Sequence, residues 1–141
     1  MSRHWAAQYI GTPWAKGGEG PDAYNCWNFF RMVQLKHFGI GIGPVQADED
    51  VPREFIEAFR THPDRAQWHE VQRPREGDGV EVWHIKYPWH IGVWVDVDGG
   101  GLLHCVRGMG VIFSRGVELP AQGFGRIVCY RHLSVQLSAA E

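Results

Sequence analysis

The sequence predicts an α+β fold, with a helix packed on an antiparallel sheet, because helical and strand patterns occupy different parts of the chain. From about Cys26 to Phe38 apolar residues follow helical spacing and further apolar residues stand between them, which predicts a largely buried helix. After Gly79 the chain changes to short segments rich in Val, Ile and Trp, which favour strands. Helices followed by a meander of strands are typical of the α+β class.

The remaining elements follow from local signals. A short helix is expected over residues 3–10, and glycines and a proline over 17–21 predict an irregular loop. Between residues 39 and 76 only one short helix, around 53–60, is predicted. An aspartate and three glycines at 98–101 predict a hairpin turn. Strands are expected at residues 80–85, 89–96, 102–106, 111–114 and 127–132.

Length and composition predict a single domain over residues 1–141. A chain of 141 residues buries roughly two-thirds of its unfolded surface. With 44% hydrophobic and 21% charged residues it is expected to be packed rather than disordered. The formal net charge of -2 creates no field that gathers a polyanion, so no nucleic-acid partner is expected.

The sequence shows neither a signal peptide nor a membrane span. The N-terminal residues lack the apolar core of about 7 to 15 residues that a signal peptide needs, so synthesis in the cytoplasm is expected. No stretch approaches the roughly 20 apolar residues of a transmembrane helix, and no membrane partner is expected. The three cysteines cannot all pair within the chain, so at least one thiol is free.

Cys26 is the candidate nucleophile. Asn25 precedes it, and asparagine is a favoured N-cap because its side chain accepts a hydrogen bond from the first helical turn. Cys26 is therefore expected in that turn, where the helix dipole and free N–H groups favour the thiolate and lower the thiol pKa below about 8.5. The alternative is a small buried apolar residue, which is what free cysteines usually are.

His90 is the candidate base. In the strand predicted over 89–96, His90 and Gly92 lie on one face, whereas the odd positions form an apolar face for the core. Gly92 removes a side chain beside His90, as a close approach by another backbone or a ligand requires. The alternative is a structural histidine, because a lone histidine on a strand more often has that role.

His104 is the candidate orienting residue. If the turn at 98–101 sets Gly92 opposite His104, then His90 and His104 become diagonal neighbours about 7 to 8 Å apart. His104 would then hold the His90 ring and fix its tautomer. A slip of one residue would place His104 on the opposite face, so this role depends on the register.

Four tryptophans are candidates for a substrate-binding cleft around a peptide or a sugar, although tryptophans in a small domain are more often core residues. They are Trp14, Trp27, Trp89 and Trp94. Cys105 and Cys129 lie in apolar strand segments and are expected to be packing residues.

Several runs resemble the NlpC-type cell-wall peptidases over about residues 8–132. These are Tyr9-Ile10-Gly11-Thr12-Pro13-Trp14, Gly17-Gly18, Gly20-Pro21-Asp22, Asn25-Cys26-Trp27, Gly77-Asp78, His90-Ile91-Gly92-Val93-Trp94-Val95 and Leu103-His104. The cysteine followed by tryptophan, the small size and the lack of wall-binding repeats look most like the branch found with bacteriophage tails. The resemblance implies a papain-like fold with Cys26 as nucleophile, His90 as base and His104 as orienting residue.

The function that this resemblance implies is hydrolysis of amide bonds in peptidoglycan stem peptides through a thioester. A peptidoglycan peptide is then the substrate and other phage tail proteins are partners, with action at the bacterial cell wall and no cofactor. Asn25 and Trp14 stand where the family usually has aspartate and tyrosine, which leaves open a non-catalytic tail assembly or wall-binding protein. A zinc site of the three candidate catalytic residues is a further alternative, because thiolate and imidazole suit zinc, although short ligand spacing is missing.

Overall fold

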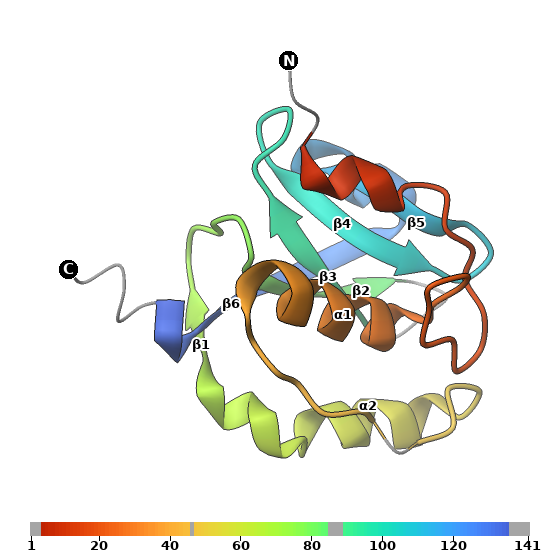
Figure 1. The fold of residues 1–141 in the computed structure, drawn as a ribbon. Helices are drawn as coiled ribbons and strands as arrows, with labels where there is room; N and C mark the ends of the chain where they lie inside the picture. The colour runs from red at the N-terminus through yellow and green to blue at the C-terminus, as the bar shows by residue number, and fades with distance from the viewer. Residues whose placement is uncertain (1–3, 46, 85–88, 136–141) are drawn as a thin grey trace.

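The computed structural model describes residues 4–45, 47–84 and 89–135, which form one six-stranded antiparallel sheet with helix α1 across one face (Figure 1). The strand order is β1-β6-β2-β3-β4-β5, so the last strand of the chain is inserted between the first two. The predicted α+β class is confirmed. No helix within these ranges is long and apolar enough to cross a membrane.

The elements alternate little between helix and strand, as the sequence pattern indicates. The strands are β1 (Trp68–Val71), β2 (Gly79–His84), β3 (His90–Val95), β4 (Gly101–Val106), β5 (Gly110–Arg115) and β6 (Phe124–His132). The α-helices are α1 (Cys26–Phe38) and α2 (Pro52–Arg60), and the 3-10 helices are η1 (Trp5–Tyr9), η2 (Pro63–Gln67), η3 (Gly116–Glu118) and η4 (Pro120–Gln122). β1 and η2 fall in the stretch where the sequence predicts only a helix around 53–60. Residue 85 of the first predicted strand lies outside the described residues.

Helix α1 begins and ends where its local signals predict. The Asn25 side chain accepts a hydrogen bond from the Asn28 N–H at 2.7 Å, which satisfies a donor that has no partner inside the helix. At the other end Gly39 adopts a left-handed φ of 68° and donates back to carbonyl groups of the last turn. Phe29 and Val33 are fully buried, so the middle of the helix anchors it to the sheet.

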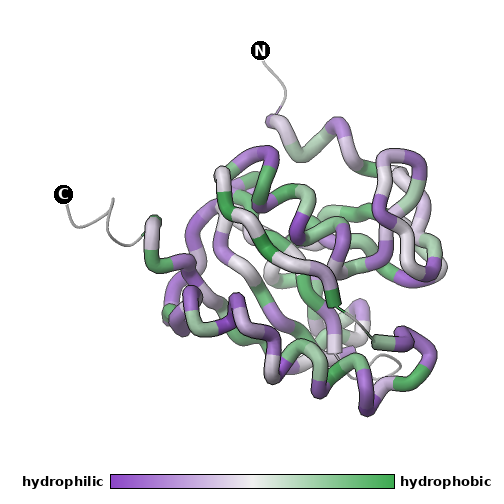
Figure 2. The backbone as a smooth tube through the Cα atoms, turned by 60° about the horizontal axis from the view of Figure 1, so that its bottom comes forward, coloured by the Kyte–Doolittle hydropathy of each residue, from purple (hydrophilic) through white to green (hydrophobic). Residues whose placement is uncertain are grey.

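The sheet buries apolar side chains on both faces. Because side chains alternate along a strand, β3 directs Ile91 and Val93 toward α1 and places His90 and Gly92 on the other face, as predicted. The tube in Figure 2 changes colour repeatedly between purple, white and green, so hydrophilic and hydrophobic residues are mixed along the whole course of the described chain. The face away from α1 has its own apolar cluster beneath η3 and η4: Val80, Val82, Leu102, Val106, Leu119, Phe124 and Cys129.

Candidate active site

The hairpin between β3 and β4 has the register that the sequence analysis required. Val93 pairs with Leu103, and the next step of this ladder sets Gly92 opposite His104. A Cβ added to Gly92 would lie only 2.8 Å from the Cβ of His104, so a glycine is needed for this close approach. Among the described residues the ladder does not continue to the start of β3, so Ile91 has no partner on β4.

Cys26 lies at this opening between the two strands. The Trp94 N–H donates toward β2, to the Asp78 carbonyl at 2.9 Å, so by alternation the Ile91 N–H points toward the β4 side. There the Ile91 backbone N–H faces the Cys26 sulfur and favours its thiolate form. The N-terminus of α1 therefore brings the thiol to the place where β3 leaves β4.

His90 reaches the opening from the other face of the sheet. Its ring lies against Phe124 of β6, with ring centroids 5.5 Å apart. Its Nε2 is 2.8 Å from Nδ1 of His104, so the predicted diagonal contact is present. No hydrogen bond joins the Cys26 sulfur to the His90 ring among the described residues, but both residues line the same cavity.

The hydrogen-bonded histidines continue into two residues that the sequence analysis did not single out. His104 Nε2 is 2.9 Å from Ser114 Oγ, and the Ser114 hydroxyl donates to Gln122 Oε1 at 2.6 Å. Ser114 pairs with Leu102, two positions from His104, so this second link is also a diagonal between neighbouring strands. The sequence placed Ser114 at the end of a predicted strand, but it did not reveal the register of β5 against β4, which brings Ser114 to His104.

Burial keeps both candidate catalytic groups neutral. Loss of water raises the pKa of the Cys26 thiol to about 12, although hydrogen bonds from the Ile91 and Trp27 backbones act in the opposite direction. The expected lowering of this pKa by the helix start is therefore wrong. Burial lowers the pKa of His90 to about 3, and the pKa of His104 also lies well below its ordinary value for the same reason.

The cavity that contains Cys26 and His90 has a volume of about 230 Å³. Its other lining residues come from the N-terminal loop, the segment around α2, the residue before β3, and β4 with the turn after it: Trp14, Glu49, Asp50, Pro52, Phe55, Ile56, Trp89, Cys105 and Arg107. Two of the four predicted cleft tryptophans, Trp14 and Trp89, are thus in place. Trp89 also stacks on Phe59 of α2, with ring centroids 3.4 Å apart.

The other two tryptophans do not line this cavity, so the prediction of a four-tryptophan cleft is wrong in part. The Trp27 indole is buried against Phe59, and its N–H donates to the Gly43 carbonyl at 3.0 Å. A helix turns by about 100° per residue, so Trp27 points away from its neighbour Cys26. Trp94 packs on the far face of the sheet, and its indole N–H donates to Asp96 at 3.2 Å.

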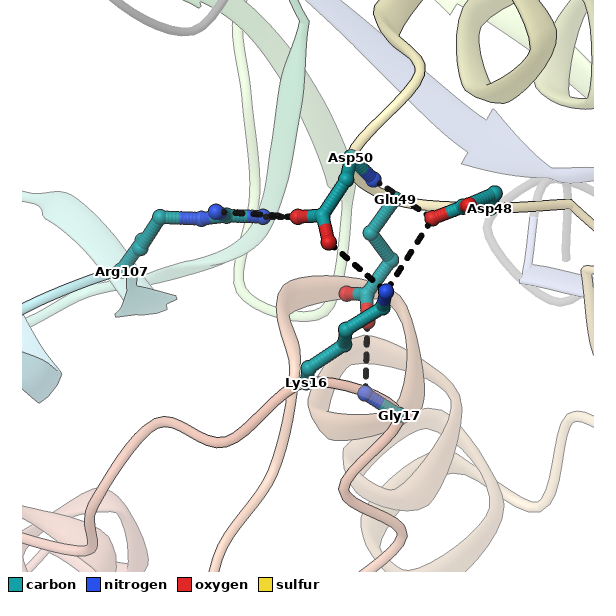
Figure 3. A network of polar contacts seen from close by, with 6 residues as sticks. All are labelled: Lys16, Gly17, Asp48, Glu49, Asp50 and Arg107. Atoms are coloured by element: carbon teal, nitrogen blue, oxygen red, sulfur yellow. Dashed lines mark hydrogen bonds and ion pairs between the residues drawn. The ribbon is translucent and has the colours of Figure 1, made fainter.

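Three polar residues that line the cavity, Glu49, Asp50 and Arg107, belong to a network of ion pairs and hydrogen bonds (Figure 3). Lys16 contacts Asp50 at 2.7 Å and Asp48 at 3.3 Å, and Arg107 contacts Asp50 at 3.3 Å. The Glu49 carboxylate accepts a hydrogen bond from the Gly17 backbone N–H. This network connects the loop before α1 to the segment before α2, a segment in which the sequence predicted no functional residue.

The three cysteines are free, and two of them line the cavity. The Cys105 thiol is fully buried and donates to the Tyr24 carbonyl at 3.2 Å, as a packing residue does. Cys129 belongs to the apolar cluster on the opposite face.

The proposed zinc ligands do not converge on a common point in the described part of the chain. The imidazole nitrogens of His90 and His104 that approach each other are 2.8 Å apart, a hydrogen-bonding distance that leaves no room for an ion between them. The arrangement instead places a thiol and an imidazole in one cavity, with a second imidazole hydrogen-bonded to the first, and these are the groups that nucleophilic catalysis uses. Comparison with protein-family models and with curated proteins finds no match to this chain.

Proposed function

We propose that this protein is a cysteine hydrolase with a papain-like arrangement, which cleaves amide bonds in peptidoglycan stem peptides as part of a phage tail. The observation that carries the proposal is the meeting of Cys26, at the start of a helix, with His90 in one cavity while His104 holds the His90 ring. The resemblance of the surrounding motifs to NlpC-type peptidases supports the substrate class.

The first half of the reaction forms a thioester. Cys26 Sγ attacks the amide carbonyl carbon while its proton passes to Nδ1 of His90, because Nε2 of that ring is engaged by His104. The carbonyl oxygen becomes an oxyanion beside the free N–H groups at the start of α1, which stabilise the charge. The intermediate then expels the amine, to which His90 returns the proton.

The second half restores the enzyme. Water attacks the thioester while His90 accepts one of its protons. The acyl group then leaves as a carboxylic acid, and His90 passes the proton to the Cys26 sulfur, which restores the thiol. Because burial keeps Cys26 and His90 both neutral, the proton has to move as the nucleophile attacks. A substrate that fills the cavity also excludes water, which strengthens the hydrogen bonds that hold the imidazolium.

The proposal is tested by digesting purified peptidoglycan and identifying the fragments by mass. We expect the parent protein to release stem-peptide fragments, Cys26→Ala to release none, and Cys129→Ala, which removes a thiol that does not line the cavity, to match the parent. His90→Ala should come close to Cys26→Ala, whereas His104→Ala should retain measurable turnover, because the nucleophile and base remain.

Two outcomes would contradict the proposal. A folded Cys26→Ala protein that digests at the parent rate would exclude the thioester mechanism. A folded parent protein that binds peptidoglycan without cleaving it would instead favour the non-catalytic alternative. Circular dichroism of every variant separates loss of chemistry from loss of fold.

A further inference from the structure

We propose that Ser114 and Gln122 are positioning residues that fix which ring nitrogen of His104, and through it of His90, carries the proton. The chain of contacts runs from η4 through β5 and β4 to β3, with links of 2.6, 2.9 and 2.8 Å. The catalytic consequence rests on the proposed function, but the tautomers themselves do not.

The direction of these hydrogen bonds is set at the Gln122 end of the series. The Gln122 Oε1 has no hydrogen, so the Ser114 hydroxyl must donate to it. A hydroxyl has only one hydrogen, and toward His104 the Ser114 oxygen is therefore an acceptor. It follows that His104 carries its proton on Nε2, the nitrogen that lies 2.9 Å from this oxygen.

The proton on His104 Nε2 in turn determines the tautomer of His90. A neutral imidazole has one N–H, and burial keeps His104 neutral, so its Nδ1 has a lone pair and accepts from His90 Nε2. Neutral His90 is then left with a lone pair on Nδ1. No hydrogen-bond partner occupies that nitrogen among the described residues, so it is available for the thiol proton of Cys26.

The opposite direction would disable the base. If the Ser114 hydroxyl donated to His104 instead, His104 would carry its proton on Nδ1 and donate it to His90 Nε2. His90 would then hold its own proton on Nδ1 and could not accept another from Cys26. Both directions satisfy the link between the two rings equally well, so the acceptor on Gln122 is what distinguishes them.

The structure holds the outer residues in place. Ser114 and the His104 ring that it contacts are fully buried, so water does not replace the hydrogen bond between them. Gln122 is exposed, but its backbone carbonyl accepts from His84 Nε2 at 3.0 Å and its N–H donates to the Leu119 carbonyl at 3.1 Å. The side chain therefore starts from a fixed point at the end of η4.

Nitrogen-15 NMR of the histidine rings tests the proposal without an activity measurement, because the shifts of Nδ1 and Nε2 report the tautomer. His90→Gln and His104→Gln identify the two rings among the eight histidines. In the parent protein at pH 7 both rings should be protonated at Nε2. In Ser114→Ala, which removes the acceptor, both should shift toward the Nδ1 tautomer.

Gln122 provides the matched pair of variants. Gln122→Met removes the oxygen and should populate the Nδ1 tautomers and lower kcat about tenfold or more, whereas Gln122→Glu keeps an acceptor and should preserve the parent tautomers. Parent rings protonated at Nδ1, or tautomers unchanged in both Ser114→Ala and Gln122→Met, would overturn the proposal. Tautomers that shift while kcat stays constant would leave the proton assignment intact and refute the role of His90 as base.

Discussion

Gly92→Ala tests whether the spacing of β3 and β4 sets the histidine contact. The new Cβ would lie 2.8 Å from the Leu103 carbonyl oxygen and 2.8 Å from the His104 Cβ, where ordinary contacts begin at 3.4 Å. Neither obstacle is the far end of a flexible side chain, so β4 has to move. The movement required is the difference between 3.4 and 2.8 Å, or about 0.6 Å.

That displacement acts directly on the bond between the rings. Lengthening the 2.8 Å contact between His90 and His104 by a similar amount takes it past the usual limit of about 3.2 Å for such bonds. We expect kcat to fall about 10²-fold, the lower end of the range for a positioned acid–base group. Overpacking should lower the free energy of unfolding by about 1 to 3 kcal/mol.

The assay combines turnover on peptidoglycan fragments with chemical denaturation of the same preparations. Gly125→Ala is the matched control, because it also lies in a strand but has no atom within 4 Å of its added Cβ. Its unfolding free energy should stay within about 0.5 kcal/mol of the parent. A Gly92→Ala protein with parent turnover and parent stability would refute the reasoning.

Two further predictions follow from burial of the titrating groups. Because the thiol pKa of Cys26 is about 12, iodoacetamide should modify it far more slowly at pH 7 than an exposed cysteine, with a rate that still rises above pH 9; a plateau near pH 7 would contradict this. The pKa of His90 falls from 6.5 unfolded to about 3 folded, so acidification protonates the unfolded chain first and removes stability between those values. The free energy of unfolding should fall by about 1.4 kcal/mol per pH unit because of this residue, and the fall should be shallower in His90→Gln; denaturation at several pH values measures both. Equal pH dependence in the parent and in His90→Gln would exclude a lowered pKa for His90.

Features with local causes could be predicted from the sequence. The cap at Asn25 and the glycine at 39 define α1 because each acts on the backbone next to it. The register of β3 against β4 was not determined by the sequence, because a slip of one residue would place His104 on the opposite face; the structure supplies it by pairing Val93 with Leu103.

Features that depend on segments distant in the sequence could not be predicted from it. Phe124 lies against His90 only because β6 is inserted beside β2, and the sequence pattern does not reveal strand order. The start of α1 acts on the Cys26 thiol locally and could be recognised from the sequence. The loss of water that raises the thiol pKa comes instead from the sheet and α2, which pack around Cys26. Trp94 shares a face with His90, but four residues of strand separate them by about 13 Å.

The position of Gln122 has a practical consequence for anyone who engineers this protein. It is an exposed residue on a short turn behind the sheet, where substitutions are ordinarily neutral for stability and are chosen freely to improve solubility or to attach a label. If its side chain sets the proton positions inside the sheet, the working site extends from the cavity through the sheet to the back surface. Stability screens would then accept changes here that activity screens reject.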